Sequence, residues 1–94
     1  MNRDAKIINL AFLAFVRTKP CCACLKPGPS DADHLQAVGR GSAKRNDLTA
    51  IPACRKCHSQ RHQIGNKSME AIYQFNLWEE NSRLLIEFFG GKHE

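Results

Sequence analysis

Five cysteines carry the clearest chemical signal in this 94-residue chain. Four of them form two C-x2-C pairs, Cys21/Cys24 and Cys54/Cys57. Two thiolates at this spacing can hold one ion across a tight turn, and four thiolates suit the tetrahedral geometry of zinc. We therefore expect one structural zinc ion bound by the two pairs, with Cys22 left outside it.

Two other chemistries compete for the same cysteines. Disulfide bonds would require an oxidising compartment. The stretch Cys54–His58 also reads C-x2-C-H, the attachment signature of c-type haem. Haem attachment would leave the first cysteine pair without a role, whereas zinc uses both pairs. Zinc binding would also supplement the small hydrophobic core that so short a chain can build.

A second group of metal-ligating residues overlaps the second cysteine pair. His58 and His62 are four residues apart, so on a helix they share one face. Asp33 could add a carboxylate oxygen from another segment, and three protein ligands with open positions are typical of a catalytic metal site. If residues 33 and 34 lie on a strand, His34 faces away from Asp33 and can act as a base. The alternative is that these histidines are ordinary polar surface residues.

The positive charge is concentrated between residues 17 and 67. The formal net charge is +5, and this stretch holds ten basic and three acidic residues. A concentrated positive field favours a polyanion such as nucleic acid. The stretch contains no aromatic side chain except histidine, so base stacking is not indicated. The basic residues expected to contact phosphates are Lys44, Arg45, Arg55, Lys56 and Arg61.

The apolar run Ile7–Val16 needs an interpretation of its own. It is shorter than the roughly 18 residues of a membrane span, so we expect no membrane partner. It resembles the hydrophobic region of a signal peptide, but no small-residue cleavage site follows it. We interpret it as part of a helix over about residues 4–17, stopped by Pro20, and expect a cytoplasmic protein. The buried stripe of this helix would be Ile7, Leu10, Ala11, Ala14 and Phe15.

The rest of the chain predicts the elements that position the reactive residues. Segment 20–30 is rich in Pro and Gly and reads as a turn. Short strands are expected within 31–38 and 48–53, followed by a helix over 54–63 that Gly65 ends. Further helices over about 68–74 and 77–89 follow, the last capped by Asn76. We expect one α+β domain over residues 1–94, with a core at about 20–66 and C-terminal helices at about 68–89.

Together these residues resemble the HNH endonucleases, also called ββα-metal or His-Me finger nucleases. The family pattern is a C-x2-C knuckle, an Asp-His or His-His pair, a loop, and then C-x2-C-H-x3-H. Here the pattern covers about residues 15–66, with DADH before the loop and CRKCHSQRH after it. The match looks most like small phage and prophage members of the recombination-enhancement type. It implies a small ββα-metal core with a four-cysteine zinc knuckle and flanking helices.

The resemblance also implies a role for each reactive residue. His34 would be the general base that activates water. Asp33 and His58 would hold the catalytic ion, with His62 as a further ligand. The same ligands accept Mg²⁺, Mn²⁺, Ni²⁺ or Zn²⁺, so the sequence leaves the ion open.

The residue that orients the general base is also open. The central Asn of the family would fall at Thr49, and Asn46 lies three residues earlier. In the recombination-enhancement group a Lys and an Asp often occupy the positions of Lys44 and Asp47. Asn46, Asp47 and Thr49 are therefore all candidates.

We predict a metal-dependent DNA endonuclease of phage or prophage recombination, nicking or cutting with little sequence specificity, as a monomer or homodimer. One alternative is a zinc-stabilised nucleic-acid-binding module that has lost catalysis. Another is an accessory interaction protein that docks through the 77–89 helix. Exposure of Trp78 or Phe89 would favour the latter.

Overall fold

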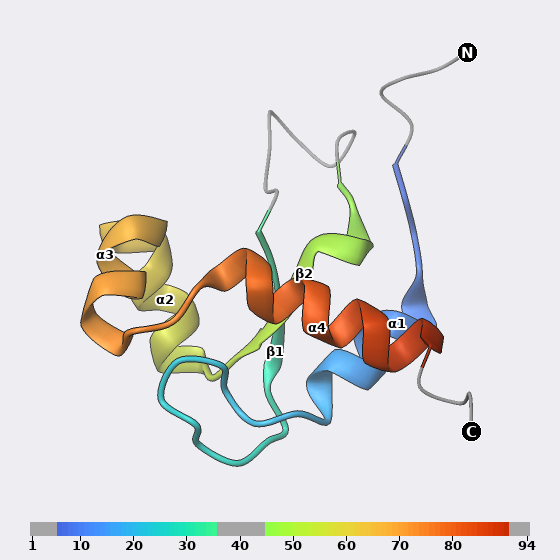
Figure 1. The fold of residues 1–94 in the computed structure, drawn as a ribbon, viewed down its shortest axis with the longest axis horizontal. Coiled ribbons are helices and arrows are strands. Elements are labelled where there is room, and N and C mark those ends of the chain that lie inside the picture. Colours follow the sequence, from blue (N-terminus) through green and yellow to red (C-terminus); the bar gives the residue numbers. More distant parts are fainter. Residues whose placement is uncertain (1–5, 36–44, 91–94) are drawn as a thin grey trace.

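Two short antiparallel strands lie at the centre of the molecule (Figure 1). The computed structural model describes residues 6–35 and 45–90, and within them the chain is a small α+β protein, as the sequence predicts. Figure 1 shows α4 crossing in front of the strands, with α1 near one end of α4 and the α2–α3 pair near the other. The element order is α1 (Leu10–Arg17), β1 (Asp31–His34), the single-turn 3₁₀ helix η2 (Asp47–Thr49), β2 (Ala50–Ala53), α2 (Arg55–Ile64), α3 (Asn66–Tyr73) and α4 (Leu77–Gly90).

The register of the two strands decides where the reactive residues point. Asp33 lies opposite Ile51, and His34 lies opposite Ala50. Because successive side chains of a strand point to opposite faces, Asp33 and His34 leave β1 on different sides. One residue after β2, the chain enters α2. The order strand, strand, helix therefore brings α2 against the side of β1 that carries Asp33.

The main hydrophobic core lies between α1, α4 and the sheet. Phe12 of α1 and Phe88 of α4 meet edge to face, with ring centroids 5.4 Å apart. Leu84 of α4 is buried, and Leu85 and Phe88 pack against the core. The buried members of this core are Phe12, Leu13, Val16, Ala50 and Leu84.

The predicted buried stripe of α1 is wrong except at Phe15, which is partly buried and packs against the core. Leu10 is 68% exposed and Ile7 45% exposed, whereas Phe12, Leu13 and Val16 are buried. The run is apolar on nearly every side, so its periodicity could not indicate which face packs inward.

The start of α1 also differs from the prediction. The Asn9 side chain accepts the Phe12 N–H at 2.9 Å and caps the helix there. Before this cap the backbone of Ile7 bonds to Arg45 and Asp47, with its N–H on the Arg45 carbonyl at 2.9 Å. The described residues before Asn9 thus lie alongside the segment that enters η2. Residues 4 and 5 of the predicted helix lie outside the described residues.

A buried asparagine ties α4 to the second strand. The Asn81 side-chain amide donates to the carbonyls of Leu48 at 2.8 Å and Ala50 at 3.1 Å. Asn81 is only 4% exposed. Both hydrogen bonds are therefore shielded from water and fix α4 across η2 and β2.

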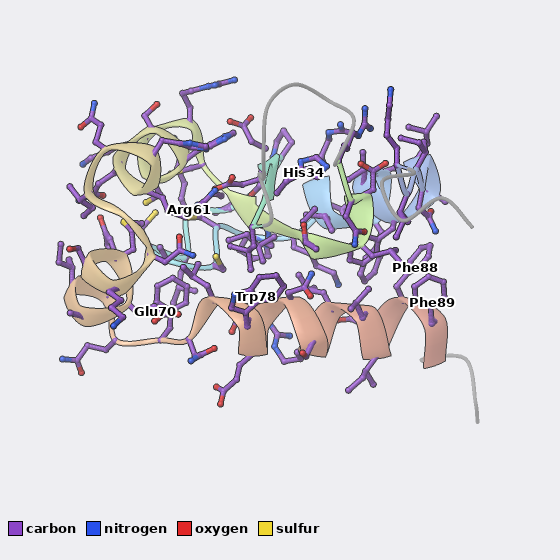
Figure 2. All side chains as sticks on the ribbon, turned by 90° about the horizontal axis from the view of Figure 1, so that it is seen from above. His34, Arg61, Glu70, Trp78, Phe88 and Phe89 are labelled. Carbon is purple, nitrogen blue, oxygen red and sulfur yellow. The ribbon has the colours of Figure 1, made fainter. Side chains whose placement is uncertain are left out.

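Two aromatic side chains of α4 are about half exposed to solvent. Trp78 is 47% exposed and Phe89 56% exposed. Figure 2 shows α4 along one side of the molecule, with His34 and Arg61 away from it. This exposure is the feature that would favour the docking interpretation, which stays a prediction. Among the described residues, no helix has the length and apolar character needed to cross a membrane.

Candidate metal centres

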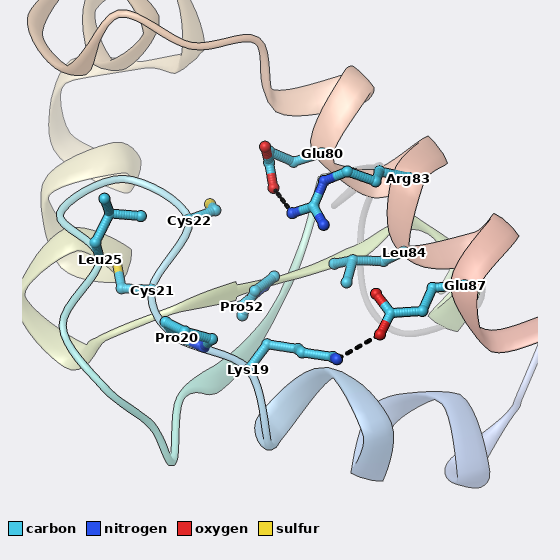
Figure 3. A pocket seen from close by; sticks show the side chains of 10 residues that line it. All are labelled: Lys19, Pro20, Cys21, Cys22, Leu25, Pro52, Glu80, Arg83, Leu84 and Glu87. Carbon is cyan, nitrogen blue, oxygen red and sulfur yellow. Dashed lines mark hydrogen bonds and ion pairs between the residues drawn. The ribbon is translucent and has the colours of Figure 1, made fainter. Parts of the chain in front are cut away.

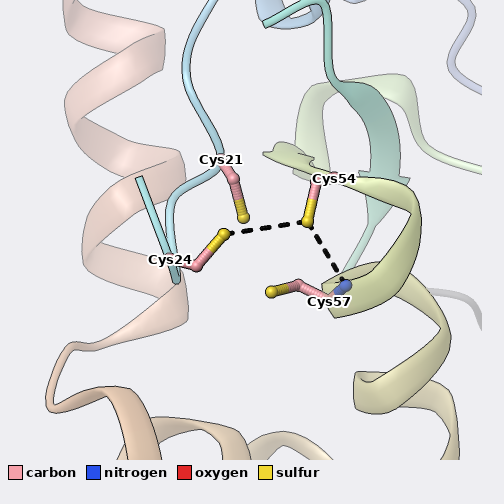
Figure 4. Close-up of side chains that lie close together, drawn as sticks. All are labelled: Cys21, Cys24, Cys54 and Cys57. Atoms are coloured by element: carbon pink, nitrogen blue, oxygen red, sulfur yellow. Dashed lines mark hydrogen bonds between the residues drawn. The ribbon is translucent and has the colours of Figure 1, made fainter. Parts of the chain in front are cut away.

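The two cysteine pairs converge on one point (Figure 4). Cys21 and Cys24 come from the turn after α1, whereas Cys54 caps α2 and Cys57 lies in its first turn. All four sulfurs lie within 4.8 Å of one another. The turn is held beside β2 because the Cys22 N–H donates to the Pro52 carbonyl at 2.9 Å.

The sulfur geometry fits zinc. The Cys24 and Cys54 sulfurs are 3.8 Å apart. A tetrahedron with Zn–S bonds of about 2.3 Å has edges of about 3.8 Å, and a disulfide would need sulfurs about 2.05 Å apart. All five cysteines are free. The four-cysteine cluster can therefore hold a metal ion such as zinc.

Electrostatics within the cluster also favour a cation. Burial raises the pKa of Cys21, but hydrogen bonds from nearby backbone groups outweigh burial and lower this pKa to about 7. Burial and the neighbouring cysteines raise the pKa of Cys57 to about 12. Four thiolates repel one another unless a cation lies between them, so metal binding here must release protons.

Cys22 lies outside the cluster, as the sequence predicts. It packs beside Leu35, Ile51 and Leu77, and burial raises the pKa of its thiol. It also lines a pocket of about 350 Å³ between α4 and the cysteine turn (Figure 3). The Lys19–Glu87 ion pair at 2.6 Å crosses this pocket, and a second pair joins two residues of α4. These pairs leave the pocket walls with balanced charge.

Asp33, His58 and His62 form the second cluster. The Nε2 atoms of His58 and His62 lie 3.4 Å and 3.5 Å from Asp33 Oδ1. Ligands at about 2.1 Å from one ion are about 3.0–3.4 Å apart at tetrahedral or octahedral angles. Asp33 is 1% exposed, and the histidines share one face of α2. The predicted set therefore meets at one point and fits a divalent ion.

Asp31 contacts the ring nitrogen of His58 that faces away from Asp33. Its Oδ2 lies 3.0 Å from His58 Nδ1. If Nδ1 carries the proton and donates to Asp31, the lone pair of Nε2 is directed to the side of Asp33. A carboxylate behind a metal-binding histidine fixes its tautomer and orientation. Our sequence reasoning missed this residue, although Asp31 and Asp33 are two apart on one strand and share a face.

Arg61 does not lie where the sequence analysis puts it. It is 8% exposed, and its guanidinium donates to both oxygens of Asp33 at 2.7 Å and 2.8 Å. Its other amino group donates to Asn66 Oδ1 at 2.7 Å. The prediction that Arg61 is a surface phosphate contact is therefore wrong for this geometry. Its position on α2 between two histidines turns it toward β1.

His34 is held on the other side of β1. Its Nε2 lies 2.8 Å from Asp47 Oδ1, and its side chain is 25% exposed. Asp47 is fully buried and also accepts hydrogen bonds from the Arg45 guanidinium and the Asn9 N–H. Burial raises the pKa of Asp47, but the hydrogen bonds from Arg45, His34 and Asn9 outweigh burial and lower it to about 2.

Of the three candidates for orienting His34, Asp47 is the one that a described hydrogen bond joins to it. The Asn46 side chain instead accepts the Leu48 N–H at 2.9 Å and caps η2. The Thr49 hydroxyl donates to the Asn46 carbonyl at 2.9 Å. Asn46 and Thr49 therefore shape the turn that carries Asp47.

The remaining predicted phosphate contacts differ in exposure. Arg55 and Lys56 open α2 and are exposed, the Arg55 side chain by 79%. The Arg45 side chain is 36% exposed and its guanidinium is bound to Asp47. Lys44 lies outside the described residues.

Comparison with known proteins places the chain in a family but assigns no activity. Residues 2–80 match a family described as protein of unknown function, DUF968. The chain is 38% identical over 53 residues to the uncharacterized protein YdfU of Escherichia coli K12. That match covers 54% of this chain and 15% of YdfU. No solved structure gives a significant match. The family match covers most of the chain, and the chain therefore belongs to the DUF968 family.

Proposed function

We propose that this chain is a metal-dependent DNA endonuclease of the HNH type, a hydrolase of phosphodiester bonds. The observation that supports this most is the pairing of two sites through adjacent residues of β1. Asp33 converges with two histidines of α2, and His34 is held by a buried carboxylate. The order of β1, β2 and α2 and the four-cysteine cluster also match the ββα-metal pattern.

His34 is the proposed general base. Asp47 is ionised at neutral pH because its pKa is lowered to about 2, so the proton in the 2.8 Å contact belongs to His34 Nε2. The lone pair then resides on Nδ1, which can accept a proton from water.

Asp33, His58 and His62 are the proposed ligands of the catalytic ion. A divalent ion bound there would offset the charge of a non-bridging phosphate oxygen and of the leaving oxygen. Arg55 and Lys56, exposed at the start of α2, would contact flanking phosphates. Such contacts do not read bases, so we expect little sequence specificity and a strong dependence on salt.

A nicking assay on supercoiled plasmid tests the proposal. The zinc-loaded protein should convert supercoiled DNA to open circles with Mg²⁺ or Mn²⁺, and a chelator should stop the reaction. The ends should carry 5′-phosphates. The absence of nicking with every divalent ion tried, although plasmid binds, would contradict the proposal.

The second candidate is a zinc-stabilised nucleic-acid-binding module without catalysis. One observation favours it: Arg61 already neutralises Asp33 through two short hydrogen bonds. If no ion displaces Arg61 from Asp33, the site holds no catalytic ion. The exposed basic residues at the start of α2 would still bind phosphates. Binding without cleavage in the plasmid assay separates this candidate from the nuclease.

A further inference from the structure

The contacts of Asp33 contain an unusual feature for a metal ligand. A buried arginine already supplies positive charge to both of its oxygens, at 2.7 Å and 2.8 Å. Asp33 is 1% exposed and Arg61 8% exposed, so water screens this pair weakly. Among the described residues, every buried side-chain nitrogen and oxygen has a hydrogen-bond partner. The charge and both oxygens of Asp33 are therefore compensated by Arg61 without an ion.

The guanidinium also extends toward the other two ligands. The amino group that donates to Asp33 Oδ1 lies 3.5 Å from His62 Nε2 and donates to the His34 carbonyl at 3.2 Å. An ion coordinated by Asp33 Oδ1 and His62 Nε2 would therefore lie within a few ångströms of this cationic group. Two positive charges at such a distance in a buried site repel strongly.

We propose that Arg61 and the divalent ion are alternative counter-ions of Asp33. This inference rests on the proposed function, because it concerns the regulation of the same ion site. In the ion-free protein Arg61 keeps Asp33 oriented and its charge compensated. When an ion binds, the guanidinium releases at least one Asp33 oxygen and keeps its bond to Asn66 Oδ1, which is 2.7 Å long in the structure. Arg61 thus weakens ion binding and makes the ion exchangeable.

The opposite possibility has a distinct signature. Arg61 could hold Asp33 in place for the ion, with both cations sharing one carboxylate. Removal of the arginine would then weaken ion binding, because Asp33 would lose its orientation. Tighter ion binding after removal of the arginine therefore supports competition for Asp33, and weaker binding supports a shared carboxylate.

Manganese titration of zinc-loaded Arg61→Gln is the first test, with free Mn²⁺ measured by electron paramagnetic resonance. Glutamine removes the charge but can still donate to Asp33, which limits the loss of stability. The control is Arg61→Lys, which keeps the positive charge. We expect Arg61→Gln to bind Mn²⁺ at least about tenfold more tightly than wild type, and Arg61→Lys to stay within about threefold. Unchanged or weaker binding by Arg61→Gln overturns the inference.

The wild-type protein supplies a second test that needs no substitution. The Arg61 Nη2 protons, which donate to Asp33 Oδ1, should exchange slowly in the ion-free protein, and Mg²⁺ should shift their NMR signal and speed their exchange. If the histidine signals respond to Mg²⁺ while these protons stay protected, the two cations share Asp33 and the inference is wrong. If His58→Ala leaves Mn²⁺ affinity unchanged, the ion lies elsewhere, which overturns the ligand set of the proposed function as well.

Discussion

Replacement of Asp47 by asparagine removes one charge at the residue that contacts His34. The native carboxylate accepts hydrogen bonds from Arg45, Asn9 and His34, and these lower its pKa from 3.8 to about 2. A difference of nearly two pKa units corresponds to about 2 kcal/mol of stability at neutral pH. Domains of this size are stable by about 5–10 kcal/mol. Asp47→Asn should therefore fold, with a melting temperature lower by about 10 °C.

The pH dependence of this contribution has a definite sign. The pKa of Asp47 is lower in the folded state, about 2 against 3.8. Its stabilising effect is therefore present above pH 4 and is lost as the pH falls toward 2. Carboxyl ¹³C NMR of the folded protein should show Asp47 ionised at every pH down to 3.8. A titration midpoint at or above 3.8 would show that the hydrogen bonds do not outweigh burial.

The effect of Asp47→Asn on cleavage should exceed its effect on stability. An amide no longer enforces the tautomer with the proton on His34 Nε2, so the fraction of His34 able to accept a proton falls. We expect nicking to slow by about 10²–10⁴-fold at 25 °C, where the variant is still folded. Plasmid nicking rates, circular dichroism and zinc content should be measured on the same preparation.

Asn46→Ala is the matched control. It removes the cap of η2, in which the Asn46 side chain accepts the Leu48 N–H at 2.9 Å. The free energy of unfolding should fall by about 1 kcal/mol. The substitution leaves the His34 contact intact, so nicking should stay within a few-fold of wild type. Equal loss of activity in Asn46→Ala and Asp47→Asn would refute a specific orienting role for Asp47.

Three further changes test other parts of the structure. Cys57→Ser should abolish stoichiometric zinc binding, about one ion per chain in wild type, and reduce the helical signal in circular dichroism; an unchanged zinc content would exclude the four-cysteine site. Asp31→Asn should weaken Mn²⁺ binding by about 10–100-fold through His58 while zinc content stays constant, and equal affinity would mean that Asp31 does not support the ligand. Asn81→Ala should lower the free energy of unfolding by about 2 kcal/mol in urea denaturation, because the carbonyls of Leu48 in η2 and Ala50 in β2 lose their donor, whereas the exposed Ser82→Ala should change stability by less than about 0.5 kcal/mol.

The sequence predicted the secondary structure where local signals are strong. Gly65 ends α2 with a φ of 89°, as its position indicated, and Asn76 caps α4 through the Glu79 N–H at 2.9 Å. The two C-x2-C pairs indicated the four-cysteine cluster because each spacing constrains a tight turn. The buried face of α1 was not predictable, because apolar residues surround nearly the whole helix and only packing on the sheet selects Phe12.

The candidate site was predictable in its ligands but not in their partners. Asp33, His58 and His62 were selected by residue type and helical spacing, and the structure brings them together. Arginine is usually exposed, so the residue type alone predicts a surface cation at Arg61. Its partner Asp33 is 28 positions away in sequence. No local pattern reveals such a pair, since it depends on how β1 packs against α2.

The most direct test of the proposed general base compares wild type with His34→Ala on supercoiled plasmid in the presence of Mn²⁺. Both proteins should carry one zinc ion, give the same circular dichroism and bind plasmid equally. We expect wild type to nick the DNA and His34→Ala to be slower by about 10²-fold or more. Nicking by folded, zinc-loaded His34→Ala at the wild-type rate would show that His34 is not the general base.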